Sequence, residues 1–112
     1  MRCLKMTKTE LSELLHDCDV AVNEWESSDE NKKKSERIVY WPYIEEDVMA
    51  SGDDYEERHT YQISIFSHGP NPLCFSKLKL ALRNEGLHPR FYREYNREEG
   101  IYHIYCALEV IV

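Results

Sequence analysis

The most regular pattern of apolar and polar positions lies in residues 59–112. Two stretches of this half alternate between apolar and polar or mixed side chains, which is the period-two pattern of strands with one buried face. The apolar face comprises Tyr61, Ile63 and Ile65 in the first stretch and Tyr102, Ile104, Cys106, Leu108 and Val110 in the second. The pattern predicts strands at 59–67 and 101–112.

Residues 71–85, between these strands, carry apolar side chains at helical spacing. Asn71 is a favourable N-cap, and Pro72 is a favourable first helical residue. Gly86 suits the left-handed conformation that closes a helix. A helix that ends near Gly86 is therefore predicted, followed by a short strand at 89–95 and a polar hairpin turn.

A first helix is predicted at residues 7–17. Three leucines recur there at helical spacing and form one apolar stripe. Thr7 or Thr9 can cap this helix, and Glu10 follows Thr7 at the spacing of a capping box.

Two strands and two polar loops are predicted between residues 20 and 58. A short strand fits 20–25, and 37–44 is rich in the β-branched and aromatic residues that favour strands. Pro42 marks an edge, a bulge or the end of the second strand, because it cannot donate to a ladder. Residues 26–36 lack apolar side chains and 45–58 are strongly acidic, so both are predicted to be mobile polar loops.

These elements predict one α+β domain over residues 1–112. The expected architecture is an antiparallel or mixed sheet of about four or five strands, with two helices packed on one face. A chain of 112 residues fits a single domain.

The negative charge of the chain is concentrated in its middle. The formal net charge is −7; residues 26–58 contribute −6, whereas residues 59–112 contribute +1. This balance argues against general nucleic-acid binding, which requires clustered Lys and Arg. The acidic segment is either a solvated region or a patch that meets a basic partner.

Candidate chemistry in the sequence is sparse. The four cysteines form no C-x-x-C pair, and the chain carries no phosphate-binding, nucleophile-elbow or metalloprotease motif. His59 and His103 are expected on neighbouring strands, but strand alternation places His103 and Cys106 on opposite faces. Cys74 and Cys106 read as buried small hydrophobic residues. We therefore expect no enzyme, no cofactor and no metal, in an intracellular and reduced chain without a membrane span.

Residues 37–110 resemble a family of phage proteins. Tyr61-Gln-Ile-Ser-Ile-Phe-Ser67 precedes a helix that ends in Glu85-Gly86-Leu87, and an acidic turn leads into Gly100-Ile-Tyr-His-Ile-Tyr105. This order is similar to the small tail-completion, tail-terminator and head–tail joining proteins of long-tailed phages and prophages. The basic run Lys32-Lys33-Lys34 and the cysteines depart from that pattern.

The resemblance implies a structural role in the virion. Proteins of this kind form rings, often hexamers, that cap the tail tube and meet connector proteins. It implies assembly in the host cytoplasm and a final place in the virion tail, with neither a membrane partner nor specific nucleic-acid binding. An acidic inhibitor, immunity protein or nucleic-acid mimic that occupies a basic partner is the alternative.

An interface for ring assembly is expected in the strand and acidic segment before residue 59. Tyr and Trp are enriched in protein–protein contacts, although scattered surface aromatics are ordinary. The candidate contact residues are Tyr40, Trp41, Tyr43, Glu45, Glu46, Asp47, Asp53, Asp54 and Tyr55.

Overall fold

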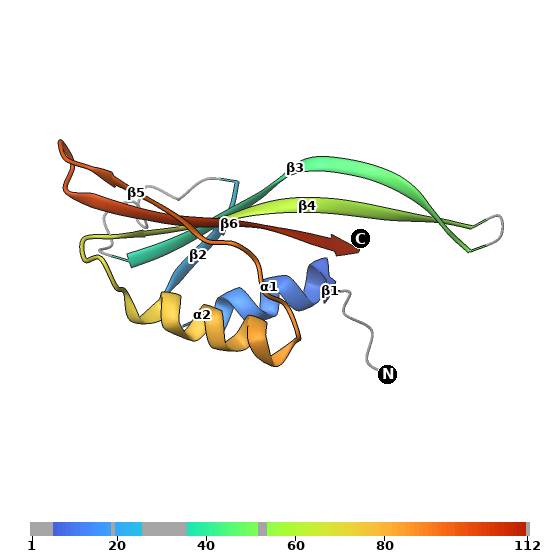
Figure 1. The fold of residues 1–112 in the computed structure, drawn as a ribbon, viewed down its shortest axis with the longest axis horizontal. Coiled ribbons are helices and arrows are strands. Elements are labelled where there is room, and N and C mark those ends of the chain that lie inside the picture. Colours follow the sequence, from blue (N-terminus) through green and yellow to red (C-terminus); the bar gives the residue numbers. More distant parts are fainter. Residues whose placement is uncertain (1–5, 19, 26–35, 52–53, 112) are drawn as a thin grey trace.

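Six strands and two helices make up the part of the chain that the computed structural model describes, namely residues 6–18, 20–25, 36–51 and 54–111 (Figure 1). The side chains of 48–51 and 54–55 are not described. In chain order the elements are β1 (Met6–Thr7), α1 (Lys8–His16), β2 (Ala21–Glu24), β3 (Glu36–Ser51), β4 (Asp54–Ser67), α2 (Leu73–Asn84), β5 (Tyr92–Asn96) and β6 (Ile101–Ile111).

All six strands belong to one mixed sheet with the order β1-β6-β4-β3-β2. The central strands β3, β4 and β6 are antiparallel, whereas β2 joins β3 and β1 joins β6 in parallel. β5 pairs with the beginning of β6, along the same edge that β1 occupies near its end. The sheet is curled into a half-barrel.

This architecture shows that the predicted fold, a sheet of four or five strands with two helices on one face, was wrong. The sheet has six strands instead of four or five, and it is curled into a half-barrel. β1 was missed because a two-residue strand is too short to show any alternation. The curl has a local cause in β3, where a bulge between Pro42 and Ile44 shifts the register against β4. Bulges of this kind bend a strand and increase its twist.

The core lies between the sheet and the helices α1 and α2, which run below the sheet in Figure 1. The predicted apolar faces of β4 and β6 are confirmed, because Tyr61, Ile63, Ile65, Ile104, Cys106 and Val110 are each 1% exposed. Leu11 and Leu15 of α1 and Leu78 and Leu82 of α2 cover this face.

The N-terminus of α1 has the predicted capping box. The Glu10 backbone N–H donates to Thr7 Oγ1 at 3.2 Å, and the Thr7 backbone N–H donates to Glu10 Oε1 at 3.4 Å. Replacing Thr7 with Ala is expected to lower the free energy of unfolding by about 1 kcal/mol. Urea unfolding followed by circular dichroism measures the change. Thr9→Ala is the control, because Thr9 is the second residue of α1 and is exposed. An equal loss in both variants would contradict the capping role of Thr7.

The N-terminus of α2 corrects a second prediction. Pro72, not Asn71, is the N-cap residue, and no side chain caps the helix. The Asn71 side chain lies instead near Arg93, whose Nη1 is 3.5 Å from Asn71 Oδ1. The end of α2 agrees with expectation, since Gly86 has a φ of 78° and directly follows the C-cap residue Glu85.

The prediction of a mobile loop at 45–58 is wrong, because this segment is largely β-strand. β3 continues to Ser51 and β4 begins at Asp54, so nearly the whole acidic segment belongs to a long antiparallel hairpin. The other predicted loop, 26–36, lies outside the described residues except for Glu36, which begins β3.

Candidate functional site

The distal part of the β3–β4 hairpin extends beyond the rest of the sheet. We call residues 45–57 the arm; the structure describes 45–51 and 54–57 of it. The last pair between β4 and β6 is Arg58 with Ile111, and the last pair between β2 and β3 is Glu24 with Tyr40. The arm therefore projects as a two-stranded ribbon, seen at the right of Figure 1. Its seven β3 residues span roughly 23 Å.

Both edges of the arm are open within the described chain. β3 from Trp41 onward pairs only with β4, and β4 before Arg58 pairs only with β3. An open strand edge presents unpaired N–H and C=O groups to which another strand can add. A two-stranded ribbon is also only marginally stable in water by itself. The arm thus has the geometry of an element that gains stability from a partner.

The arm carries acidic side chains in positions that disfavour the isolated hairpin. Seven of its thirteen residues are acidic and none is basic, so its formal net charge is −7. Asp47 pairs directly with Glu57, and like charges in directly opposite positions destabilise a sheet. Glu57 also contacts His59, whose Nε2 lies 3.1 Å from Glu57 Oε1. Glu45, Glu46 and Asp47 are exposed.

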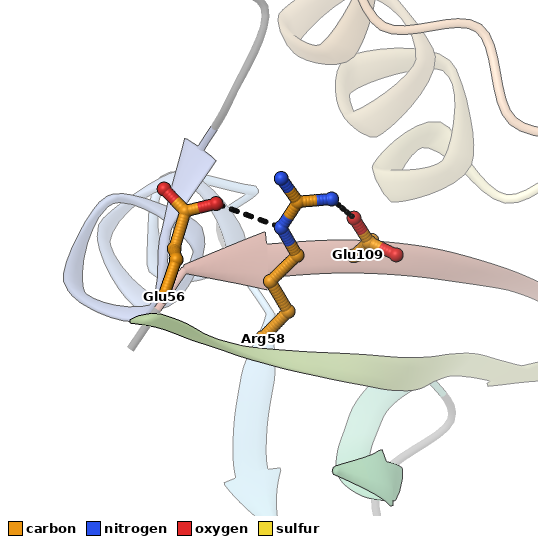
Figure 2. A network of polar contacts seen from close by, with 3 residues as sticks. All are labelled: Glu56, Arg58 and Glu109. Atoms are coloured by element: carbon orange, nitrogen blue, oxygen red, sulfur yellow. Dashed lines mark hydrogen bonds and ion pairs between the residues drawn. The ribbon is translucent and has the colours of Figure 1, made fainter. Parts of the chain in front are cut away.

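Arg58 fixes the base of the arm. Its Nε donates to Glu56 Oε2 at 2.7 Å, and its Nη1 donates to Glu109 Oε1 at 3.2 Å (Figure 2). Glu56 belongs to β4 and Glu109 to β6, so the guanidinium ties the arm to the end of the neighbouring strand. This link adds a side-chain contact to the backbone pairing of β3 and β4 at the base of the arm.

Apolar side chains are exposed where the arm meets the body. Tyr43 is 53% exposed and Ile44 is 44% exposed, both next to the bulge in β3. Trp25 lies at the end of β2, is exposed and has a φ of 76°, an unusual value for a residue other than glycine. Its backbone N–H donates to the Tyr40 carbonyl at 2.8 Å, which places it beside β3. Exposed aromatic groups of this kind favour a contact surface.

The structure separates the predicted contact residues into three groups. Tyr40 is contradicted as a contact residue, because it is 4% exposed and its hydroxyl donates to Ser12 of α1 at 3.4 Å. Trp41 is half-buried, while Tyr43 and the acidic residues of 45–47 are exposed. Asp54 and Tyr55 lie in β4 with their side chains not described, and Asp53 lies outside the described residues.

Apart from the arm, the structure has a groove on the sheet face opposite Ile65 and Ile104. Register places Arg37, Phe66, His103 and Glu94 side by side on four strands, β3, β4, β6 and β5. The Arg37 guanidinium lies 4.6 Å from the Phe66 ring centroid, and Phe66 stacks on His103 at 4.6 Å. This row and the β5–β6 turn line an open groove of about 550 Å³. Its remaining lining residues are Tyr95, Asn96, Arg97, Glu98, Glu99 and Ile101.

Ser64, His103 and Glu94 have part of the arrangement of a nucleophile, base and acid. His103 Nε2 lies 2.8 Å from Ser64 Oγ, and His103 Nδ1 lies 3.8 Å from Glu94 Oε2. Ser64 is nevertheless 0% exposed, and it pairs with Val39 on one side and Tyr105 on the other. A buried serine in mid-sheet has neither access to substrate nor free N–H groups for an oxyanion hole. The contact therefore orients His103, and the absence of enzymatic activity remains a prediction.

His103 makes the stability of the fold depend on pH. Burial lowers the pKa of His103 below its usual value, and Glu94 only partly offsets this effect. The unfolded chain therefore takes up a proton more readily than the folded chain as the pH falls below about 6.5. The free energy of unfolding should decrease between pH 7.5 and pH 5.5, and His103→Gln should make this decrease smaller.

Urea unfolding at the two pH values tests this dependence. His16→Gln, at an exposed histidine of α1, controls for the loss of one histidine. The explanation fails if His103→Gln leaves the decrease unchanged, or if both variants reduce it equally.

The histidines and cysteines considered for catalysis do not come together. His59 pairs with Val110 and His103 pairs with Phe66, so the two histidines lie far apart along β4 and β6. Cys106 is buried on the opposite face from His103, as predicted, and burial raises its pKa to about 12. Burial also raises the pKa of Cys74 to about 11. Both thiols are therefore protonated and unreactive near neutral pH.

Metal-ligand clusters and membrane-spanning helices are absent from the described ranges. No group of three or more His, Cys, Asp or Glu side chains there is arranged to hold a metal ion. Neither α1 nor α2 has the length and apolar character that a bilayer-spanning helix requires. Searches against protein-family models and curated proteins find no match to the sequence.

Proposed function

We propose that this chain is a structural protein of the phage tail-completion or head–tail joining type, which assembles into a ring at the end of the tail. The observation that carries the self-association is the arm, a two-stranded ribbon with two open edges beyond the sheet. The link to phage tails rests on the resemblance of residues 37–110 to that family. Assembly in the host cytoplasm and a final location in the virion tail follow from the same proposal.

Self-association accounts for features of the arm that the isolated chain leaves unexplained. The directly opposed Asp47 and Glu57 weaken the hairpin unless a cation from outside it lies nearby. Tyr43 and Ile44 expose apolar surface to water, which is unfavourable. Burial of this surface against a neighbouring copy would lower the free energy of the assembly. Arg58 ties the base of the arm to β6, which limits the motion of the arm and the conformational entropy lost when it docks.

An acidic binding protein that occupies a basic partner is the second candidate. It is favoured by the net charge of −7 in the arm. It differs from the first candidate in one measurable respect: it needs no second copy of the chain.

Sedimentation velocity of the full chain over a hundredfold concentration range separates the two candidates. Tail-completion function predicts conversion of monomer into one larger species of uniform mass, seen as rings by electron microscopy. The acidic binder predicts a monomer at every concentration, at both 50 mM and 500 mM salt. A monomer throughout the series would overturn the proposed function.

A further inference from the structure

We propose that the arm of one copy docks on the outward face of α2 in the next copy of the chain. This inference rests on the proposed function and names the two surfaces that meet. We define the α2 face as Leu73, Lys77, Leu80 and Arg83, which follow one another at spacings of three and four residues and share one side of the helix.

The α2 face exposes apolar side chains that the core does not use. Leu73 is 65% exposed and Leu80 is 60% exposed, the highest values among the large aliphatic side chains of the described chain. The opposite side of α2 is buried and already packs against the sheet and α1. Two exposed leucines flanked by cations suit a partner that offers both apolar and acidic groups.

The charges of the two surfaces are opposite. The α2 face carries two basic residues, Lys77 and Arg83, and no acidic residue, a net charge of +2, whereas the arm has −7. The groove near His103 is a poorer partner, because three glutamates outnumber two arginines among its lining residues. Charge complementarity of this kind steers association and fixes which surfaces meet.

The two surfaces also match in apolar character and in length. Tyr43 and Ile44 at the base of the arm are exposed in the same way as Leu73 and Leu80. The twelve residues of α2 span about 18 Å and the arm about 23 Å. An arm laid along α2 therefore brings Glu45 and Asp47 within reach of Lys77 and Arg83.

The contact must form between copies. The arm points away from the body, and α2 lies beneath the sheet, so the arm does not reach the α2 of its own chain (Figure 1). A contact between two different surfaces of the same protein is heterologous. Repeated around an axis, it closes into a ring, which is the assembly that the proposed function requires.

Charge reversal on each surface tests the contact. The arm variant carries Glu45→Lys and Asp47→Lys, and the helix variant carries Lys77→Glu and Arg83→Glu. Each variant alone should remain monomeric in sedimentation velocity at concentrations where the wild-type chain assembles. An equimolar mixture of the two should assemble, because positions 45 and 47 of each arm then meet positions 77 and 83 of opposite charge on the other variant. A single chain with all four substitutions should assemble by itself.

Two controls keep the outcomes distinct. Arg97→Glu, in the β5–β6 turn, makes the same charge change as one of the two helix substitutions, away from α2, and should leave assembly intact. Assembly of both charge-reversal variants by themselves would overturn this contact while leaving self-association in place. Failure of the mixture to assemble, with each variant folded by circular dichroism, would overturn it as well. A wild-type chain that never assembles overturns the proposed function itself.

Discussion

Replacing residues 47–57 with Asn-Gly will give a folded chain that no longer self-associates. Asn-Gly is the preferred two-residue connection of a hairpin, and this replacement keeps the Glu46–Arg58 pair in register. No residue of the arm belongs to the core cluster of the described chain. The thermal unfolding midpoint should therefore stay within a few degrees of the wild-type value, while the larger species disappears from sedimentation velocity.

The Asn-Gly replacement also removes five acidic residues, so a second variant removes negative charge without removing the arm. Glu98→Gln with Glu99→Gln removes two acidic groups from the β5–β6 turn, at the other end of the molecule, and should assemble normally. The role of the arm would be refuted by an Asn-Gly variant that still forms the wild-type species.

Ile63→Ala is the substitution expected to damage the fold most clearly. Ile63 is 1% exposed in the middle of β4, where it pairs with Tyr40 of β3 and Cys106 of β6. Truncating it removes buried apolar surface and leaves a cavity in a close-packed core, at a cost of about 2–5 kcal/mol. Since small domains are stabilised by only about 5–15 kcal/mol, the variant should unfold at much lower urea concentration.

Ile44→Ala provides the control for that substitution. The same side chain is truncated one strand away, at a position that is 44% exposed. Its cost in dilute, monomeric protein should be within about 0.5 kcal/mol. Equal losses in the two variants would contradict the core described for β4.

Periodicity predicted the elements that bury a face. Leu11 and Leu15 mark α1 and Leu78 and Leu82 mark α2, because burial against the sheet requires apolar residues at helical spacing. Alternation likewise marked β4 and β6. These elements are predictable because the same residues specify the local structure and the core.

The arm was not predictable in the same way. Glu and Asp are poor strand formers, and residues 45–58 show no alternation of apolar and polar positions. The strand there is continued by the register of the β3–β4 hairpin, which begins in the body of the sheet at Glu36 and Ser67. Pairing with β4 thus overrides the low strand preference of these residues. Their acidic composition by itself predicts a loop.

The polar contacts of the outer face depend on register as well. Alternation places Ser64 and His103 away from the core, but their contact requires that Ser64 pair with Tyr105 and Phe66 with His103. A shift of one residue would move every side chain to the other face. The sequence contains no signal for this register, so Ser64 was missed and His103 was placed only on a face.

Amide hydrogen exchange of the arm, in dilute and in concentrated protein, tests the central claim most directly. The two-stranded ribbon has open edges in the monomer, so its amides should exchange quickly in dilute solution. We predict that peptides covering 45–57 and 73–84 become protected at concentrations where sedimentation shows the larger species, while the β4–β6 core peptides stay unchanged. An increase in mass without added protection of the arm would contradict the account.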